Sequence, residues 1–432
     1  RRIMTFYTHR ILFLTFLLHF TTSQNTSRDS KFLGLFNVVQ FANDVCNSTV
    51  NNEQGICYTS QECNRFGGKA VSPCASGFGV CCVFVKNCRG DRSMGQEIMY
   101  FQNDNYPDVD RLPNMCMLSI PIKDTNICQL RLDFIEFDLD PGSQFSSPCD
   151  QDYLEIFTNS GSDGLGTGKL CGNNKGQHLY ISLMSQFDSP SMRIVTDMRE
   201  SSEESGKRGY RWNIKITQID CNSASSTSEL KAPDGCLQYF QERRGTITSF
   251  NWDPALPRKY VPNQNYAICI QRSISDCELR LRRSAGIPKG STSIGKPLTG
   301  GTCGVNGCGV NDCIKSSGGN NDVMSDHLEI NSFYNDVQNA QTDKKYKIEH
   351  IYCGEGVGST KARGNNNNNN GDEVEASEII SQTKGPFVIS FFADEFSSDG
   401  NTNTGTNKNM DELGFSLDYS LFTSCTKIII MP

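Results

Sequence analysis

The sequence predicts an all-β chain in which two antiparallel β-sandwiches follow a small disulfide-rich module. Three observations support this prediction. First, the 432 residues include 20 cysteines, an even number that is typical of a disulfide framework. Second, short runs of strand length recur between Gly, Asn, Asp and Ser clusters, and no segment keeps a 3.6-residue period. Third, the motifs of one long block recur in the same order in a second block, which indicates an internal duplication.

The first residues are typical of a secretory signal peptide. We expect translation to begin at Met4, and residues 4–23 to be removed by cleavage near Ser23. Arg10 supplies the basic flank of this segment, and the apolar run 11–20 that follows is too short to span a bilayer. No later stretch approaches the roughly 20 apolar residues of a spanning helix. The sequence therefore predicts a secreted, extracellular chain without a membrane span.

Composition narrows the classes of partner. The chain has 41 Lys and Arg residues against 48 Asp and Glu residues, so it offers no broad positive surface to a nucleic acid. Disulfides persist in the oxidising extracellular compartment, which agrees with the cysteine content. Asn25 and Asn47 each begin an Asn-X-Ser/Thr sequon, and we expect both to be glycan acceptors.

The disulfide-rich module is expected over residues 40–87. A cysteine block of roughly forty residues buries too little surface to fold alone, so disulfides of about 2–4 kcal/mol each are expected to replace a large core. Zinc is a less favoured alternative, because the block contains no histidine. The residue pattern leaves the pairing open among Cys46, Cys57, Cys63, Cys74, Cys81 and Cys82.

The two long blocks, residues 88–221 and 236–425, share a series of motifs. "DYLEI" corresponds to "DHLEI", "LCGNN" to "YCGEG", and "GYRWNIKITQIDC" to "LGFSLDYSLFTSC". The second block adds Cys303 and Cys308, for which an internal bridge is favoured over a soft-metal site. The corresponding cysteines are Cys88, Cys116, Cys128, Cys149, Cys171 and Cys221 in the first block, and Cys236, Cys269, Cys277, Cys313, Cys353 and Cys425 in the second.

Both blocks have the pattern of strands. In the first, residues 130–134 place alternate apolar side chains on one face, and the alternation resumes from Ile135 in the shifted register, which predicts a β-bulge at Phe134 and Ile135. The second block contains Gly- and Asn-rich segments such as "RGNNNNNNGDEVEAS", which are too polar to pack and are expected to be loop insertions. Between the blocks, "NSASSTSELKAPDG" is the predicted linker, and it allows bivalent binding if it holds both blocks within reach of one partner.

The motifs of the first long block resemble those of the CUB domain. The resemblance rests on "RLDFIEFDLD", "CDQDYLEIF", "LCG", "MRIVTD" and "GYRWNIKI", and it extends more weakly to the second block. It implies two CUB-like domains, each a jelly-roll-type sandwich of two antiparallel sheets. It also implies the bridges Cys88–Cys116, Cys149–Cys171, Cys236–Cys269 and Cys313–Cys353, and it leaves Cys128–Cys221 and Cys277–Cys425 as an additional pair in each block.

The disulfide-rich module resembles clip-like modules, because its six cysteines end in "CC" with "GICYTSQEC" ahead of them. Together with the CUB-like domains, this module makes the chain similar to secreted arthropod CUB proteins. The resemblance implies a non-enzymatic protein that binds other extracellular proteins. An alternative function is a non-catalytic regulator or docking cofactor of an extracellular serine protease cascade, in which the clip-like module is the docking element.

Some CUB domains hold calcium with three acidic side chains, and the resemblance assigns these positions to Asp140, Asp152 and Asp197. Clustered carboxylates repel one another unless a cation neutralises them, and Ca²⁺ accepts oxygen ligands in flexible geometries. A calcium-held carboxylate is expected to offer an oxygen to a Lys or Arg of a partner protein. The alternative is that the acids are solvated loop residues that do not converge. In the second block Asp326 and Asp394 match, but no acid occupies the first position.

Catalysis has little support in the residues. No histidine lies in an H-E-x-x-H motif, and no serine-protease nucleophile motif follows. A glycosidase-type acid pair is less favoured, because no aromatic sugar-stacking cleft is evident. The segment "CRGD" at 88–91 contains the Arg-Gly-Asp tripeptide of integrin ligands, but a tripeptide alone is weak evidence. His178 is expected to cap a strand or to lie at the rim of a sandwich.

Overall fold

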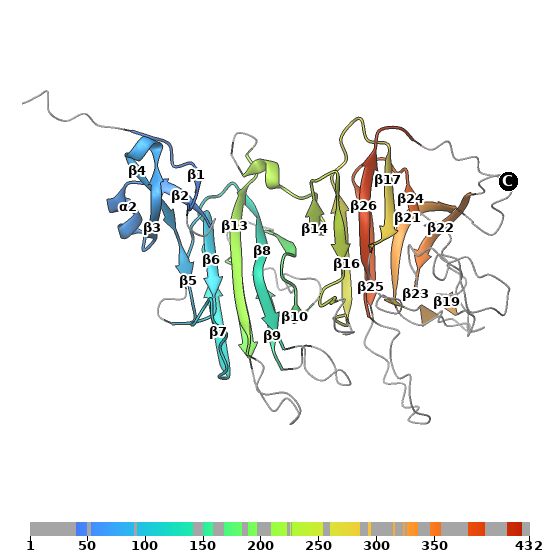
Figure 1. The fold of residues 1–432 in the computed structure, drawn as a ribbon, viewed down its shortest axis with the longest axis horizontal. Helices are drawn as coiled ribbons and strands as arrows, with labels where there is room; N and C mark the ends of the chain where they lie inside the picture. Colours follow the sequence, from blue (N-terminus) through green and yellow to red (C-terminus); the bar gives the residue numbers. More distant parts are fainter. Residues whose placement is uncertain are drawn as a thin grey trace, which may run out of the picture. The chain divides into compact units, whose positions relative to one another are not determined.

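The described residues form an N-terminal module and two β-domains along the chain (Figure 1). Strands dominate all three, which confirms the all-β prediction. The structure is a computed structural model, and it describes residues 40–49, 53–89, 93–140, 149, 151–158, 168–183, 189–196, 209–222, 225, 227–253, 260–285, 293–294, 314–315, 323–324, 326–335, 346–355, 379–393 and 413–425.

The N-terminal module is built on a four-stranded sheet of order β1-β2-β4-β3. Its helix α2 (Ser60–Arg65) begins after Thr59, whose hydroxyl accepts the N–H of Glu62 while the Glu62 carboxylate accepts the N–H of Thr59. This reciprocal capping satisfies two N–H groups that the first turn leaves without a helical partner. The other elements are β1 (Val45–Asn47), β2 (Gln54–Tyr58), β3 (Lys69–Cys74), η1 (Ala75–Gly77) and β4 (Gly79–Val83).

Three disulfides hold this module together, in a pairing that the sequence left open. They join Cys46 to Cys81, Cys57 to Cys74, and Cys63 to Cys82. Adjacent cysteines 81 and 82 thus connect the central strand β4 to β1 on one side and to helix α2 on the other. Both lie fully buried, so the bridges themselves occupy the place of an apolar core.

The N-terminal module continues into the sheet of the first β-domain. Strand β5 (Val85–Lys86) pairs in parallel with β6 (Ile98–Gln102), and the Tyr100 N–H donates to the Phe84 carbonyl at 2.8 Å. The Tyr100 hydroxyl in turn accepts the N–H of Gln54 at 2.7 Å. Burial raises the pKa of Tyr100 to about 12, so this phenol stays protonated at neutral pH. The module therefore covers an edge strand that would otherwise present unpaired backbone groups.

The first β-domain consists of two sheets. One has the order β10-β8-β13-β6-β5, with β11 also pairing with β8, and the other has the order β7-β12-β9. Alternate residues of β12 are buried, as expected for a strand with one face on a core. The strands are β7 (Asn114–Ser119), β8 (Ile127–Leu139), β9 (Tyr153–Phe157), β10 (Gly172–Asn173), β11 (His178–Ser182), β12 (Ser191–Thr196) and β13 (Arg211–Asp220).

The bulge predicted in β8 is confirmed. Ile214 of β13 lies opposite Phe134, whereas the preceding Asn213 lies opposite Glu136, so Ile135 is the extra residue and is exposed. The bulge changes which face the following side chains occupy. Phe134 and Phe137, which a regular strand would place on opposite faces, are both fully buried with ring centroids 4.7 Å apart.

The main sheet of the second β-domain is one connected nine-stranded sheet instead of two separate ones, and β18 with β23 and β19 with β20 form two small sheets. Strand β24 makes the connection, because it pairs with both β17 and β21. The core is aromatic, and the Phe391 ring lies 5.3–5.5 Å from those of Tyr260, Tyr266 and Phe415. The strands are β14 (Cys236–Phe240), β15 (Arg244–Thr248), β16 (Gln264–Ile270), β17 (Glu278–Arg283), β18 (Ser293–Ile294), β19 (Ile314–Lys315), β20 (Val323–Met324), β21 (His327–Asn335), β22 (Tyr346–Tyr352), β23 (Gly354–Glu355), β24 (Ile379–Ser381), β25 (Phe387–Ala393) and β26 (Ser416–Phe422).

Five disulfides connect described residues within the two domains. Cys353 is also disulfide-bonded, while Cys303, Cys308, Cys313 and the Asn-rich segment lie outside the described residues. The five bridges are Cys88–Cys116, Cys128–Cys221, Cys149–Cys171, Cys236–Cys269 and Cys277–Cys425, the same partners that the resemblance gave.

The segment between the two β-domains is bonded to the first domain over part of its length. The hydroxyl oxygen of Thr227 accepts the N–H of Asp220 at 3.0 Å, just before the one-turn helix η2 (Ser228–Leu230). The side-chain amide of Gln129 then makes two hydrogen bonds of 3.0 Å with Ala232, one to its N–H and one to its carbonyl. This linker is therefore held against the first domain by hydrogen bonds, which its polar composition does not predict.

Candidate functional site

The first two predicted calcium ligands lie at the same end of the first β-domain. Asp140 directly follows β8, and Asp152 directly precedes β9. The backbone N–H of Asp140 lies 3.4 Å from Oδ2 of Asp152. The bridge between Cys149 and Cys171 anchors the approach to β9, because Leu170, beside Cys171, also pairs with β9. Of the three predicted ligands, the structure thus brings these two together.

Burial distinguishes the two acids. Asp152 is only 1% exposed, whereas Asp140 is half-buried. A buried carboxylate is stable only where donors or a cation compensate the loss of water. Asp152 also acts on a neighbouring phenol: burial raises the pKa of Tyr210, and the charges of Asp110, Asp104 and Asp152 add to the rise. Negative charge is therefore concentrated around Tyr210 at this end of the domain.

The third predicted ligand, Asp197, lies outside the described residues. Its predecessor Thr196 is the last residue of β12 and is paired with Asn114 of β7. The Thr196 hydroxyl accepts the N–H of Asn114 at 3.0 Å, and its side chain also hydrogen-bonds to Tyr210. Strand β12 therefore ends beside the phenol that Asp152 influences. Within the described ranges, no three His, Cys, Asp or Glu side chains form a group that could hold a metal ion.

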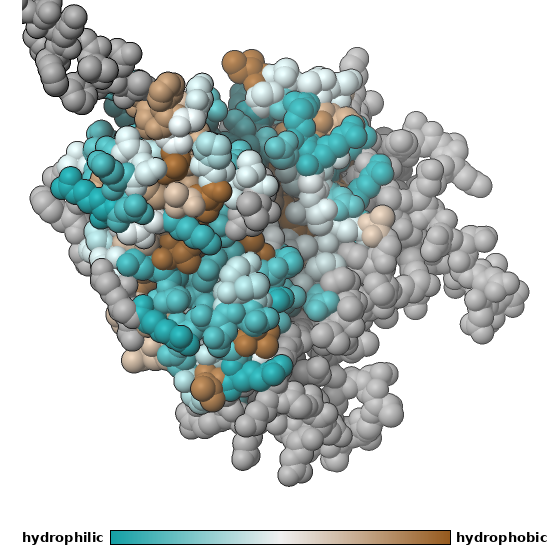
Figure 2. Space-filling view, turned by 60° about the vertical axis from the view of Figure 1, so that its left-hand side comes forward, coloured by the Kyte–Doolittle hydropathy of each residue, from teal (hydrophilic) through white to brown (hydrophobic). Residues whose placement is uncertain are grey.

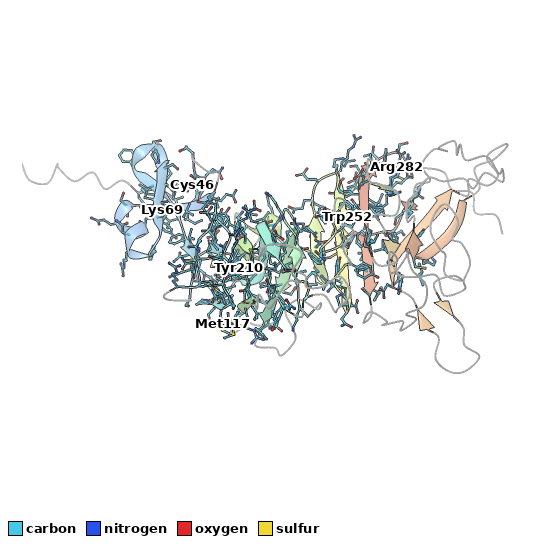
Figure 3. All side chains as sticks on the ribbon, turned by 60° about the horizontal axis from the view of Figure 1, so that its bottom comes forward. Cys46, Lys69, Met117, Tyr210, Trp252 and Arg282 are labelled. Atoms are coloured by element: carbon cyan, nitrogen blue, oxygen red, sulfur yellow. A yellow bond between two sulfur atoms is a disulfide. The ribbon has the colours of Figure 1, made fainter. Side chains whose placement is uncertain are left out.

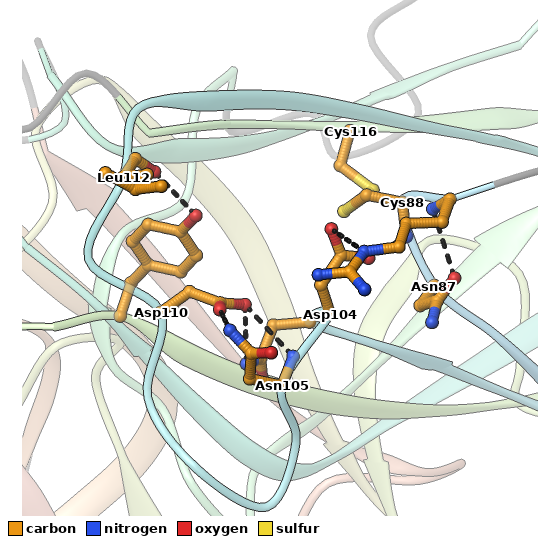
Figure 4. Close-up of polar contacts among 10 residues, drawn as sticks. Asn87, Cys88, Asp104, Asn105, Asp110, Leu112 and Cys116 are labelled. Carbon is orange, nitrogen blue, oxygen red and sulfur yellow. Dashed lines mark hydrogen bonds and ion pairs between the residues drawn. A yellow bond between two sulfur atoms is a disulfide. The ribbon is translucent and has the colours of Figure 1, made fainter.

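A second polar cluster, which the sequence analysis missed, lies in the loop between β6 and β7 (Figure 4). The Asp110 carboxylate accepts the side-chain N–H groups of Asn103, at 2.9 Å, and of Asn105. Its backbone N–H and carbonyl pair with Tyr210, and the Tyr210 hydroxyl donates to the Leu112 carbonyl at 2.7 Å. Side-chain amides thus compensate the negative charge of Asp110, so this carboxylate does not require a cation. The alternating Asn and Asp residues of "NDNYPDVD" were the available signal, since such residues hydrogen-bond locally in turns.

The arginine of the Arg-Gly-Asp tripeptide has a partner inside the protein. Arg89 Nε lies 3.3 Å from the Asp104 carboxylate, which also accepts the N–H of Cys88 at 3.0 Å (Figure 4). The Arg89 side chain is well exposed, so this ion pair contributes little stability. Residues 90 and 91, which complete the tripeptide, lie outside the described residues.

The corresponding acid of the second β-domain is Asp326. Asp326 immediately precedes β21, as Asp152 precedes β9, and it is also buried. Its carboxylate accepts a hydrogen bond from the hydroxyl of Tyr260, a fully buried residue. Asp394, the other matching acid, lies outside the described residues. A protein hydroxyl therefore compensates this carboxylate in the second domain.

The outward face of the sheet β7-β12-β9 carries exposed apolar side chains. Met115 is 57% exposed and Phe157 is 39% exposed, and Arg193 of β12 lies with its guanidinium 4.9 Å from the Phe157 ring centre. Figure 3 shows Met117 at the outer edge of the first domain, whereas Tyr210 lies among its strands. On the face displayed in Figure 2, apolar patches alternate with polar ones. Exposed Met, Arg and aromatic residues are typical of surfaces that contact other proteins.

Of the two predicted glycan acceptors, only Asn47 lies among the described residues. Asn47 is exposed at the end of β1, and Asn25 lies outside the described residues.

His178 opens β11, but it is buried against β14 and does not lie at a rim. In the described part of the chain, no helix is long and apolar enough to cross a membrane.

Comparisons with known proteins identify both β-domains. A family model for the CUB domain matches residues 88–206, and one for the animal CUB domain matches residues 233–422. Similar solved structures include the CUB1-EGF-CUB2 domains of rat MASP-1, at 14% identity and a TM-score of 0.24 over 76% of this chain and 99% of that one. The human MASP-1/3 counterpart shows 16% identity and a TM-score of 0.23, covering 76% and 100%.

The full extracellular region of zebrafish Gpr126/Adgrg6 is also similar, at 12% identity and a TM-score of 0.23, covering 78% of this chain and 37% of that one. No curated protein sequence matches the chain. The two family matches cover the strands of both β-domains except β5 and β13. The chain therefore contains two CUB domains, which are non-catalytic modules of protein–protein interaction.

Proposed function

We propose that this chain is a secreted, non-enzymatic protein that binds other extracellular proteins through a calcium-dependent surface of its first CUB domain. The juxtaposition of Asp140 and Asp152 at one end of that domain is the observation that carries the proposal. Disulfides and CUB domains are both typical of extracellular proteins, and the exposed sequon at Asn47 suits a glycoprotein.

The donor set suits calcium. Asp140 and Asp152 supply carboxylate oxygens, the ligands that Ca²⁺ prefers, and Asp197 is the proposed third acid. Bound calcium would supply a fixed positive charge that neutralises the buried Asp152 carboxylate. The acids would in turn keep a carboxylate oxygen in a defined direction, available for a charge-assisted hydrogen bond. The partner would therefore present a Lys or Arg side chain.

The contrast between the domains supports restricting calcium to the first one. In the second domain, the Tyr260 hydroxyl donates to Asp326, and no acid stands at the position that matches Asp140. A cation there would therefore have fewer carboxylate ligands. Asp326 is therefore the matched control for Asp152.

The proposed function predicts a calcium-dependent attraction to basic side chains. Full-length protein passed over a polylysine surface at about 0.15 M salt should bind more strongly in calcium than in chelator. Asp152→Asn should abolish that calcium-dependent increment, and Asp326→Asn should preserve it. Both variants remove one negative charge. An equal loss in both would therefore mean that the attraction depends only on the net charge of the protein. That outcome, or the absence of any calcium-dependent increment, would refute the proposal.

A further inference from the structure

The contact between the two CUB domains includes one imidazole that acts as a hydrogen-bond acceptor. His178 opens β11 of the first domain, and its Nε2 accepts the backbone N–H of Tyr239 in β14 at 3.1 Å. Because the ring accepts at Nε2, it is neutral and carries its proton on Nδ1. The ring also packs against Phe240 with centroids 4.8 Å apart, and it is only 7% exposed.

Other hydrogen bonds of this contact use uncharged groups. The Gln238 side-chain amide donates to the His178 carbonyl at 3.2 Å, and the Asn174 amide oxygen accepts the Asn251 N–H at 2.8 Å. The Gln129 amide holds Ala232, as described above. Amides keep their hydrogen-bonding capacity at any physiological pH, whereas an imidazole loses its acceptor when it takes up a proton.

The charges that face His178 come from one neighbouring strand. Arg131 and Asp133 of β8 pair with each other at 2.8 Å, and Arg131 also donates to the Tyr180 hydroxyl at 2.9 Å. The remaining titratable neighbours are the uncharged Tyr180 of β11 and Tyr239 of β14. Burial, and next the positive charge of Arg131, lower the pKa of His178 to about 4, while Asp133 partly opposes the shift.

We propose that the contact between the two CUB domains is an acid-sensitive latch in which His178 is the titrating group. At neutral pH the imidazole accepts the Tyr239 N–H, and the latch is closed. A proton on Nε2 would set two N–H donors against each other and would leave a positive charge buried close to Arg131. Separation of the domains relieves both the repulsion between the two donors and the burial of the positive charge, because it returns the imidazolium to water. Acidification would thus release two binding domains that are held in a fixed relation at neutral pH.

The direction and size of the effect follow from the two pKa values. In the closed state the pKa is about 4, and in the open state an exposed histidine returns to about 6.5. Since the open state binds protons more readily, closure is favoured above the open-state pKa and is weakened as the pH falls through this window. Between about pH 7.5 and pH 5, the ratio of open to closed molecules should rise by about 30-fold.

The test measures opening of the full-length protein at about pH 7.5 and pH 5. Hydrogen exchange of residues 236–240, corrected for the pH dependence of intrinsic exchange, should show that protection falls at the lower pH. His178→Gln offers an uncharged amide oxygen in place of Nε2, so the pH-dependent loss should disappear. His350→Gln, a change at an exposed histidine, should retain it.

Two outcomes would overturn the latch: equal protection of residues 236–240 in the wild-type protein at both pH values, or the same pH-dependent loss in His178→Gln. Should His178→Gln fail to fold, NMR titration of the wild-type histidines replaces it. A resonance of His178 that titrates below its ordinary pKa, with loss of protection of residues 236–240 over the same pH range, supports the latch. Titration near its ordinary pKa of about 6.5 with unchanged protection refutes it.

Discussion

Replacing Trp212 by alanine should lower the free energy of unfolding by about 3–5 kcal/mol. Trp212 is fully buried on β13, the strand that pairs with both β8 and β6. Its indole stacks on Tyr210 with centroids 5.5 Å apart and lies 5.9 Å from the Phe101 ring centre. The truncation would therefore leave a cavity between two aromatic rings, and it would also remove the ring that stacks on Tyr210, whose phenol is influenced by the charge of Asp152.

Two further variants separate the cavity from other effects. Trp212→Phe retains one aromatic ring and leaves a smaller cavity, and the indole N–H that it removes has no hydrogen-bond partner among the described residues, so the loss should be smaller. Trp252→Ala changes the only other tryptophan, which is partly exposed, and should also cost less. Circular dichroism during guanidinium unfolding measures all three. Equal losses for Trp212→Ala and Trp252→Ala would contradict the packing described here.

Replacing Gly172 by alanine should disrupt the contact between the CUB domains. An alanine Cβ at this position would lie 1.8 Å from the Asn251 side-chain oxygen, and Gly172 has a φ of +81°. Gly176 is a matched control, because its φ is +80° but open space surrounds the added Cβ. Both variants should lose about 1–2 kcal/mol from the left-handed backbone. Gly172→Ala should lose about 1–3 kcal/mol more through the clash.

The measurement combines thermal unfolding with hydrogen exchange of residues 236–240 at neutral pH. The clash at Gly172 can be relieved by separation of the domains, so that variant should show both a lower midpoint and reduced protection. Gly176→Ala should change the midpoint alone. Identical behaviour of the two variants would show that Asn251 does not pack against Gly172 in solution.

Local patterns in the sequence were sufficient for the strands and for the bulge. The alternation over residues 130–139 predicted both β8 and the irregularity at Phe134 and Ile135, because side-chain direction reports directly on the register of a strand. The order of the cysteines, together with the CUB resemblance, gave the partners that the structure joins in the two β-domains. Local spacing did not give the pairing inside the N-terminal module, where Cys81 and Cys82 turn to different elements.

The candidate site was only partly predictable. Asp140 and Asp152 flank two strands whose ends meet, and the motif "CDQDYLEIF" indicated this placement. Asp110 was missed because its carboxylate is held by Asn103 and Asn105, and its backbone pairs with Tyr210 from a distant strand. Such a partner depends on how the sheets pack, which residue types and local spacing do not encode.

Contacts between the domains were the least predictable feature. His178, Gln129 and Asn174 have ordinary polar side chains in the sequence, and their roles appear only when β11 lies against β14 and the linker folds back. Tyr260 likewise becomes the donor to Asp326 through packing of residues far apart in the chain. Long-range polar pairs of this kind leave no periodic pattern that a sequence alone can reveal.

Calorimetric titration of the full-length protein with Ca²⁺ tests the central claim most directly. The account predicts saturable binding of calcium to the wild-type protein, loss of that binding in Asp152→Asn, and unchanged binding in Asp326→Asn. The isosteric amide retains the shape of the carboxylate, so loss of binding would report on charge and not on unfolding. A wild-type protein that takes up no calcium, or an Asp152→Asn variant that binds it equally well, would contradict the account.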